Sequence, residues 1–219
     1  MIFMKQYLVV ISMLVLIACN NEKKETETTT DVDTVTQNEP TGDSTAPNGQ
    51  NHMKTMHDAM SGMMSRMEGM KASGNPDHDF AMVMKHHHEG AIEMARAEIA
   101  GGSDANMKQK AQKMIDDQQR EISVFDKVLQ SGIPSGNSDF GQKAVKMMTP
   151  MSDIKMESGS LDAMFASMMI PHHQDGIKMA KEYLRVGTNS ELKTLAQNMI
   201  SANEKEIGEL QEWLNSHRS

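Results

Sequence analysis

Two doubled histidines are the residues of this chain best suited to chemistry. His87-His88 stands in the segment Met84 to Ala95, and His172-His173 stands in a close copy, Met169 to Ala180, at a constant offset of 85 residues. The same register continues upstream to a matched phenylalanine and downstream into matched apolar and acidic residues. A unit of roughly fifty residues is therefore repeated in tandem, a pattern that a chance histidine-rich tract does not produce.

Methionines accompany both histidine pairs. Each pair has one methionine three residues before its first histidine and another seven residues after it, so imidazole nitrogens and thioether sulfurs would share one layer of a helix. Such soft and borderline ligands favour Cu(I), or Ag(I), over iron. The candidate metal ligands are Met84, His87, His88, Met94, Met169, His172, His173 and Met179.

A second methionine-rich stretch lies upstream of the first repeat. From His52 to Ser73 methionines recur at three- and four-residue steps, while Leu, Ile, Val and Phe are absent. The spacing predicts an amphipathic helix. Its methionines have two interpretations: packing residues of a helix that covers the bundle, or a second Cu(I) or Ag(I) cluster formed by Met53, Met56, His57, Met60 and Met64.

Helical hairpins must position these ligands. Apolar stripes predict a helix up to about Ala100, a turn at residues 101–103 and a return helix to about Gln130. The second repeat predicts the same plan, with its turn at residues 187–189 and its return helix from Ser190 to Leu214. Two hairpins whose apolar faces need each other predict an all-α fold, a four-helix bundle with an additional N-terminal methionine-rich helix.

Polar residues interrupt the return stripes at matching places. In antiparallel helices joined at these turns, Gln118 should lie level with His87, and Asn203 level with His172. A buried amide beside a buried imidazole can orient a metal-bound ring, and it can equally satisfy a purely structural histidine.

Two glutamates keep a different metal chemistry open. By the same register, Glu121 should lie level with Met84, and Glu206 level with Met169. Carboxylates and histidines on four helices hold iron in di-iron bundles. An iron-dependent metal oxidase is therefore the alternative of a different class.

The N-terminal region predicts export. Residues 1–18 read as a signal peptide, and Leu16-Ile17-Ala18-Cys19 resembles a lipoprotein cleavage box, which makes Cys19 the lipid attachment site. Residues 19–51 are polar and predict a disordered tether to the membrane, and residues 52–219 form the Met/His-rich bundle with repeats at about 77–130 and 162–215. With a single cysteine the exported part has no disulfide, and a net charge of -8 argues against a nucleic-acid partner.

At the doubled histidines the chain resembles the domain of unknown function 305 family, bacterial proteins with a ferritin-like helical fold that include CopM-like periplasmic copper-binding proteins. Residues 87–95 and 172–180 both carry its motif, His-His followed by a small residue and Met-Ala. The resemblance covers about Met53 to Leu214 and implies copper binding and metal tolerance outside the cytoplasm, without implying a reaction. In the second copy Asp175-Gly176 stands where the first has Gly90-Ala91.

Together these features predict a lipid-anchored protein of the cell envelope that binds Cu(I) and buffers it or transfers it, with a copper-efflux or chaperone protein as candidate partner. The sequence shows no nucleophile-base arrangement and no phosphate-binding loop. Besides the oxidase, a structural or partner-binding bundle with inert methionine packing stays open.

Overall fold

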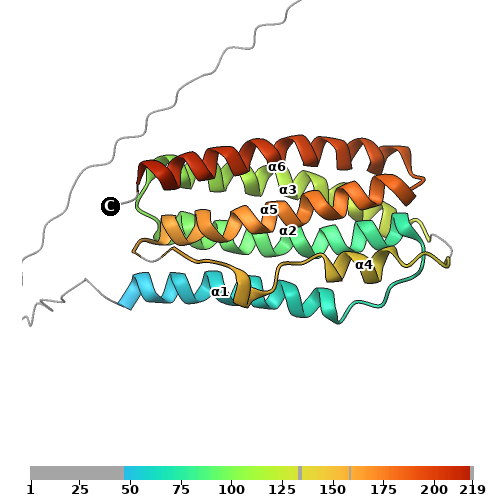
Figure 1. Ribbon diagram of the computed structural model, residues 1–219, viewed down its shortest axis with the longest axis horizontal. Helices are drawn as coiled ribbons and strands as arrows, with labels where there is room; N and C mark the ends of the chain where they lie inside the picture. Colours follow the sequence, from blue (N-terminus) through green and yellow to red (C-terminus); the bar gives the residue numbers. More distant parts are fainter. Residues whose placement is uncertain (1–46, 133–134, 158, 218–219) are drawn as a thin grey trace, which may run out of the picture. The chain divides into compact units, whose positions relative to one another are not determined.

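The computed structural model describes residues 47–132, 135–157 and 159–217, and in this part of the chain the fold is all-helical, without strands (Figure 1). The elements are α1 (Pro47–Glu68), α2 (Pro76–Gly101), α3 (Ala105–Gln130), α4 (Phe140–Lys146), the 3-10 helix η1 (Met151–Asp153), α5 (Leu161–Val186) and α6 (Ser190–Ser216). The predicted signal peptide, Cys19 and the tether up to residue 46 lie outside the described residues. Helix α1 begins at Pro47, upstream of the predicted start at His52.

Side-chain caps set the starts of the four long repeat helices. Asn75 accepts hydrogen bonds from the first turn of α2, and Asp104 does the same for α3. Ser160 caps α5, and Asn189 caps α6. Each cap satisfies amide groups that have no partner inside the helix, so these polar residues determine where the helices begin.

The helices form three layers (Figure 1). Helices α2 and α3 form the first hairpin, and α5 and α6 form the second. The hairpins meet through α2 and α5, which make up the middle layer, with α3 and α6 on one side and α1 and α4 on the other. The predicted four-helix bundle with an added N-terminal helix is confirmed, and the helices that carry the histidines are the most enclosed ones.

Each repeat locks the turn of the other repeat with an aspartate at the start of its first helix. Asp162 of α5 accepts hydrogen bonds from the Ser103 amide at 2.9 Å, the Ser103 hydroxyl at 2.7 Å and the Asp104 amide at 2.8 Å. At the equivalent position of α2, Asp77 accepts from the Thr188 amide at 2.8 Å and the Asn189 amide at 3.1 Å. These reciprocal contacts fix the axial position of α2 relative to α5.

The methionine stripe of α1 forms core with α2 and α5. Met56, Met60, Met63 and Met67 are at most 2% exposed. A methyl group at Gly90 of α2 would lie 2.8 Å from the Met63 sulfur, so the glycine lets α1 approach closely. These four side chains therefore pack in the core between α1 and the histidine-bearing helices.

The connector between the hairpins covers α5 much as α1 covers α2. Asp175, the counterpart of Gly90, is buried and accepts hydrogen bonds from the Thr149 amide at 2.6 Å and the Thr149 hydroxyl at 2.9 Å. The departure of the second histidine motif from the first thus reflects different covering segments. Pro171 lies inside α5, which continues as one helix through it.

No helix among the described residues combines the length and the hydropathy that crossing a membrane requires.

Candidate metal centre

His87 and His172 lie against each other where α2 crosses α5. Their ring centroids are 3.6 Å apart at an interplanar angle of 30°, and each side chain is 1% exposed. The His87 Nε2 is 3.1 Å from the backbone carbonyl oxygen of His172, and the His172 Nε2 is 3.1 Å from that of His87. The two repeats are therefore joined by a reciprocal pair of hydrogen bonds around an approximate twofold axis.

These hydrogen bonds determine which ring nitrogen carries the proton. A carbonyl oxygen only accepts, so Nε2 must be the N–H in both rings. Burial, together with the charges of the neighbouring histidines, lowers the pKa of His87 and of His172 well below 6.5, which keeps both rings neutral. Nδ1 of each ring then holds a free lone pair, and neither Nδ1 atom has a hydrogen-bond partner among the described residues.

Small residues one turn after each histidine make room for the opposite ring. A methyl group at Gly176 would lie 3.2 Å from Cε1 of His87 and 3.1 Å from Nδ2 of Asn203. The matching residue of the first repeat, Ala91, is fully buried. In the second repeat the predicted space exists beside Gly176, and His87 of the first repeat borders it.

The outer histidines face the glutamates of the return helices. His88 Nε2 bonds Glu121 at 2.5 Å, and His173 Nε2 lies 3.1 Å from Glu206 in an orientation that makes no hydrogen bond. Both histidines are at most 3% exposed, and their Nδ1 atoms have no partner in the described structure. Including the two central histidines, four buried Nδ1 atoms have no hydrogen-bond partner among the described residues: those of His87, His88, His172 and His173.

The glutamates contact residues about one turn away from the methionines that were predicted to lie level with them. Glu121 reaches His88 instead of Met84, and Glu206 reaches His173 instead of Met169. A helical side chain leans toward the N-terminus of its own helix. In an antiparallel pair the two side chains therefore lean toward each other, and a glutamate contacts a residue about one turn closer to the C-terminus of the partner helix than the residue at its own level.

The predicted role of the amides also needs correction. The hydrogen-bond partner of each central histidine is a backbone carbonyl of the opposite repeat, and no hydrogen bond joins Gln118 to His87 or Asn203 to His172 among the described contacts. The Gln118 side chain is 7% exposed, and its oxygen has no partner in the described structure. Asn203 and His87 of the other repeat both border the space beside Gly176.

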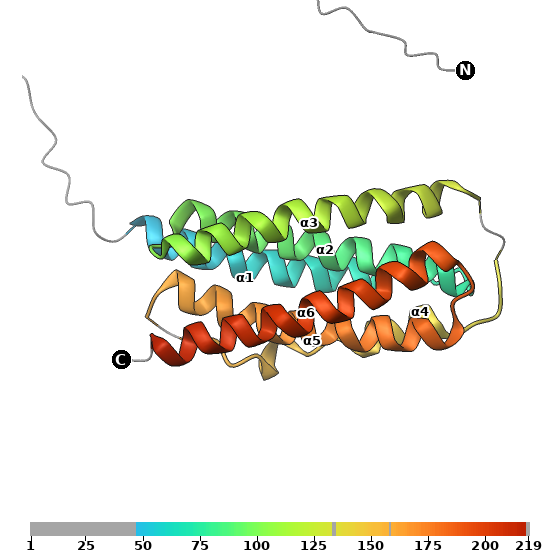
Figure 2. The same ribbon diagram turned by 90° about the horizontal axis from the view of Figure 1, so that it is seen from above.

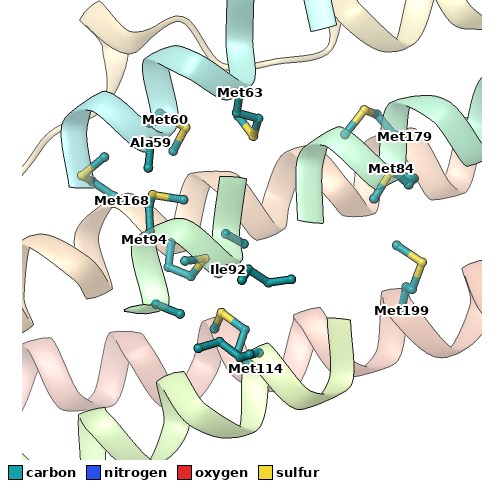
Figure 3. Packing of buried hydrophobic residues seen from close by; sticks show 14 of the residues in the cluster. Ala59, Met60, Met63, Met84, Ile92, Met94, Met114, Met168, Met179 and Met199 are labelled. Atoms are coloured by element: carbon teal, nitrogen blue, oxygen red, sulfur yellow. The ribbon is translucent and has the colours of Figure 1, made fainter. Parts of the chain in front are cut away.

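The predicted methionine ligands all lie in the core around this centre. Met84, Met94, Met169 and Met179 are fully buried. Figure 3 labels Met84, Met94, Met168 and Met179 among the side chains of the buried cluster, together with Met60 of α1. The thioethers of α2 and α5 therefore belong to the same buried core as the histidine-bearing helices.

The upstream methionine residues are divided between two environments. Met56 and Met60 point into the core, Met53 and Met64 are half-buried, and His57 is exposed. In the predicted second cluster, His57 is therefore exposed, whereas Met56 and Met60 are buried.

The donors at the centre are imidazoles and thioethers. Among the residues that the structure describes, no three His, Cys, Asp or Glu side chains are arranged to hold one metal ion. Unpaired buried Nδ1 atoms in a methionine-rich core would suit a soft monovalent ion.

The fold and the site define a class of protein: a tandem helical-hairpin bundle with paired histidines at the contact between its halves. The chain belongs to the family described as "Domain of unknown function (DUF305)", whose model matches residues 17–129 and 134–215. No curated protein and no solved structure matches the chain.

Proposed function

We propose that this protein binds Cu(I), or Ag(I), at the centre formed by His87, His88, His172 and His173, with sulfur ligands from the surrounding methionines. The observation that carries the proposal is the set of four buried Nδ1 atoms without hydrogen-bond partners. An unpaired buried polar atom costs free energy. A ligand that takes these lone pairs would remove that cost.

The hydrogen bonds on the far side of the rings support the same proposal. Metal-binding histidines commonly donate their other N–H to a carbonyl or a carboxylate, which orients the ring. Here His87 and His172 bond carbonyl oxygens, while His88 bonds Glu121. Each of these three rings thus has Nε2 engaged and Nδ1 free.

The cellular role follows from the sequence. The signal peptide and the lipoprotein box at Cys19 favour attachment to a membrane of the cell envelope, in the periplasm or at the cell exterior. A soft-metal centre outside the cytoplasm would serve copper buffering, tolerance or transfer to a copper-efflux or chaperone protein.

The test is an anaerobic titration of the protein with Cu(I) against a chromogenic chelator, repeated with Ag(I), Zn(II) and Fe(II). We expect Cu(I) and Ag(I) to be retained and Fe(II) to be lost. The double variant His87→Leu/His172→Leu should lose the tightest Cu(I) while its helical circular dichroism is preserved. Stoichiometric iron with oxygen consumption, and no Cu(I) retained, would overturn the proposal in favour of a metal oxidase.

A further inference from the structure

Residues of α3 and α6 line a groove. These are the second helices of the two hairpins and lie in the same outer layer (Figure 2). The groove has a volume of about 810 Å³ and an apolar floor that includes Met114, Leu210 and Trp213. Its α3 wall carries two lysines, and its α6 wall carries one lysine and three glutamates. One of these wall residues, Glu206, is also the residue that faces His173, so the groove reaches the histidine layer.

Glu206 and His173 are close but not bonded to each other. Their nearest atoms, Oε2 and Nε2, are 3.1 Å apart, and Nε2 has no hydrogen-bond partner although His173 is 1% exposed. The glutamate side chain is 23% exposed. A carboxylate that solvent can reach therefore stands beside an imidazole whose nitrogen is buried and unpaired.

The equivalent pair in the first repeat is closed. Nε2 of His88 bonds Glu121 at 2.5 Å, which engages both groups, and Glu121 does not line the groove. The two repeats therefore differ at this point. Of these two described pairs, only Glu206 and His173 are not hydrogen-bonded to each other.

Lys113 is the cation that faces this pair across the groove. Its hydrogen bond to Asp117 raises its pKa, and the charges of Glu206 and Glu209 raise it further. The other wall lysines, Lys110 and Lys205, are paired with Glu209. Lys113 is paired with Asp117, and its charge also interacts with Glu206, so it is a positive charge that would oppose a metal ion bound at Glu206.

We propose that Glu206, in the wall of this groove, and the buried His173 behind it form a second metal site, which takes a divalent cation of borderline softness such as Zn(II). A carboxylate oxygen and an imidazole nitrogen suit such an ion, with water from the groove completing its coordination. The site differs in ligand type from the Cu(I) centre, and it rests on the proposed function only because His173 belongs to both.

The test is calorimetric titration of the protein with Zn(II), comparing Glu206→Gln with its matched control Glu121→Gln. We expect Glu206→Gln to weaken Zn(II) binding by at least roughly tenfold, and Glu121→Gln to leave it unchanged. Lys113→Gln should tighten Zn(II) binding, because it removes the opposing charge. This gain tests the proposal even if Glu206→Gln perturbs folding.

Equal Zn(II) binding in wild type and Glu206→Gln, or equal losses in both glutamine variants, would overturn the proposal. Cu(I) titration of the same proteins separates the two claims. If Zn(II) depends on Glu206 while Cu(I) is not retained, the groove site stands and the proposed function fails. If Cu(I) is retained while Zn(II) binding does not depend on Glu206, the proposed function stands and the groove site fails.

Discussion

Glu98 and Tyr183 occupy equivalent positions in the two hairpins. Each contacts an aspartate of the opposite repeat: Glu98 contacts Asp162, and Tyr183 contacts Asp77. The Tyr183 hydroxyl donates to Asp77 at 2.7 Å. Glu98 lies against Asp162, which already accepts from the Ser103–Asp104 turn. Gly102 and Gly187 leave the space that lets these two side chains fold under their turns.

The comparison implies that Glu98 carries a proton. Glu98 is fully buried, and no N–H or O–H group among the described residues bonds its oxygens. Burial and the neighbouring Asp162 carboxylate raise the pKa of Glu98 from 4.5 to about 8. A protonated Glu98 can donate to Asp162 as the tyrosine donates to Asp77.

Stability should therefore fall as the pH rises toward 8. Between pH 4.5 and about 8 the folded protein keeps the Glu98 proton, whereas the unfolded chain has lost it. The loss should be roughly 2 to 4 kcal/mol. His87 and His172 have the opposite effect, because their pKa values are lowered in the folded protein. As the pH falls below 6.5, the unfolded chain binds protons at these residues and the folded protein does not, so the stability decreases. The Glu98 effect is thus clearest from pH 6.5 to 8.

Glu98→Gln isolates this effect, because its amide donates to Asp162 without titrating. Urea unfolding at several pH values should show the decline in wild type and its absence in Glu98→Gln. Tyr183→Phe is the matched control, since it removes a donor to Asp77 but should keep the decline. A wild type with constant stability from pH 6.5 to 8 would show that Glu98 is not protonated in the fold.

Gly176→Ala tests the contact between the repeats. A new methyl group would press on His87 and Asn203 at 3.2 and 3.1 Å, so one of them must move. Replacing glycine in a helix normally stabilises by about 1 kcal/mol. We expect that gain to be cancelled here and the Cu(I) affinity to change.

Gly208→Ala provides the control, because nothing lies within 4 Å of the added group on α6. Chemical unfolding should show the full gain of about 1 kcal/mol for this variant and unchanged Cu(I) binding. Equal gains in both variants would mean that His87 does not occupy the space beside Gly176.

The hairpins and their turns could be predicted because the apolar stripes and capping residues are local signals. The docking of one hairpin on the other was not predictable in detail. That His87 bonds the carbonyl of His172 depends on the placement of α5, which neither hairpin encodes alone. The matched aspartates at positions 77 and 162 were the overlooked signal, since both stand at the same point of the repeat.

The division of the α1 methionines predicts how they respond to substitution. Changing Met53, Met56, Met60 and Met64 to Leu should cost less than about 1.5 kcal/mol at each position, since Leu and Met have similar volumes. We expect the central Cu(I) to be retained, because the exposed His57 lies apart from the buried sulfurs. Thermal unfolding and Cu(I) stoichiometry measure both effects. A drop in stoichiometry would restore this stripe as a second cluster.

The most direct test of the copper centre is long-range nitrogen-15 NMR of the histidine rings, recorded without metal and with one equivalent of Ag(I). Without metal, His87 and His172 should show Nε2 protonated and Nδ1 bare, as their bonds to carbonyl oxygens require. With Ag(I), the Nδ1 signals of these two rings should shift while Nε2 keeps its proton. Unchanged Nδ1 signals in all four buried rings, with Ag(I) bound elsewhere, would contradict the account.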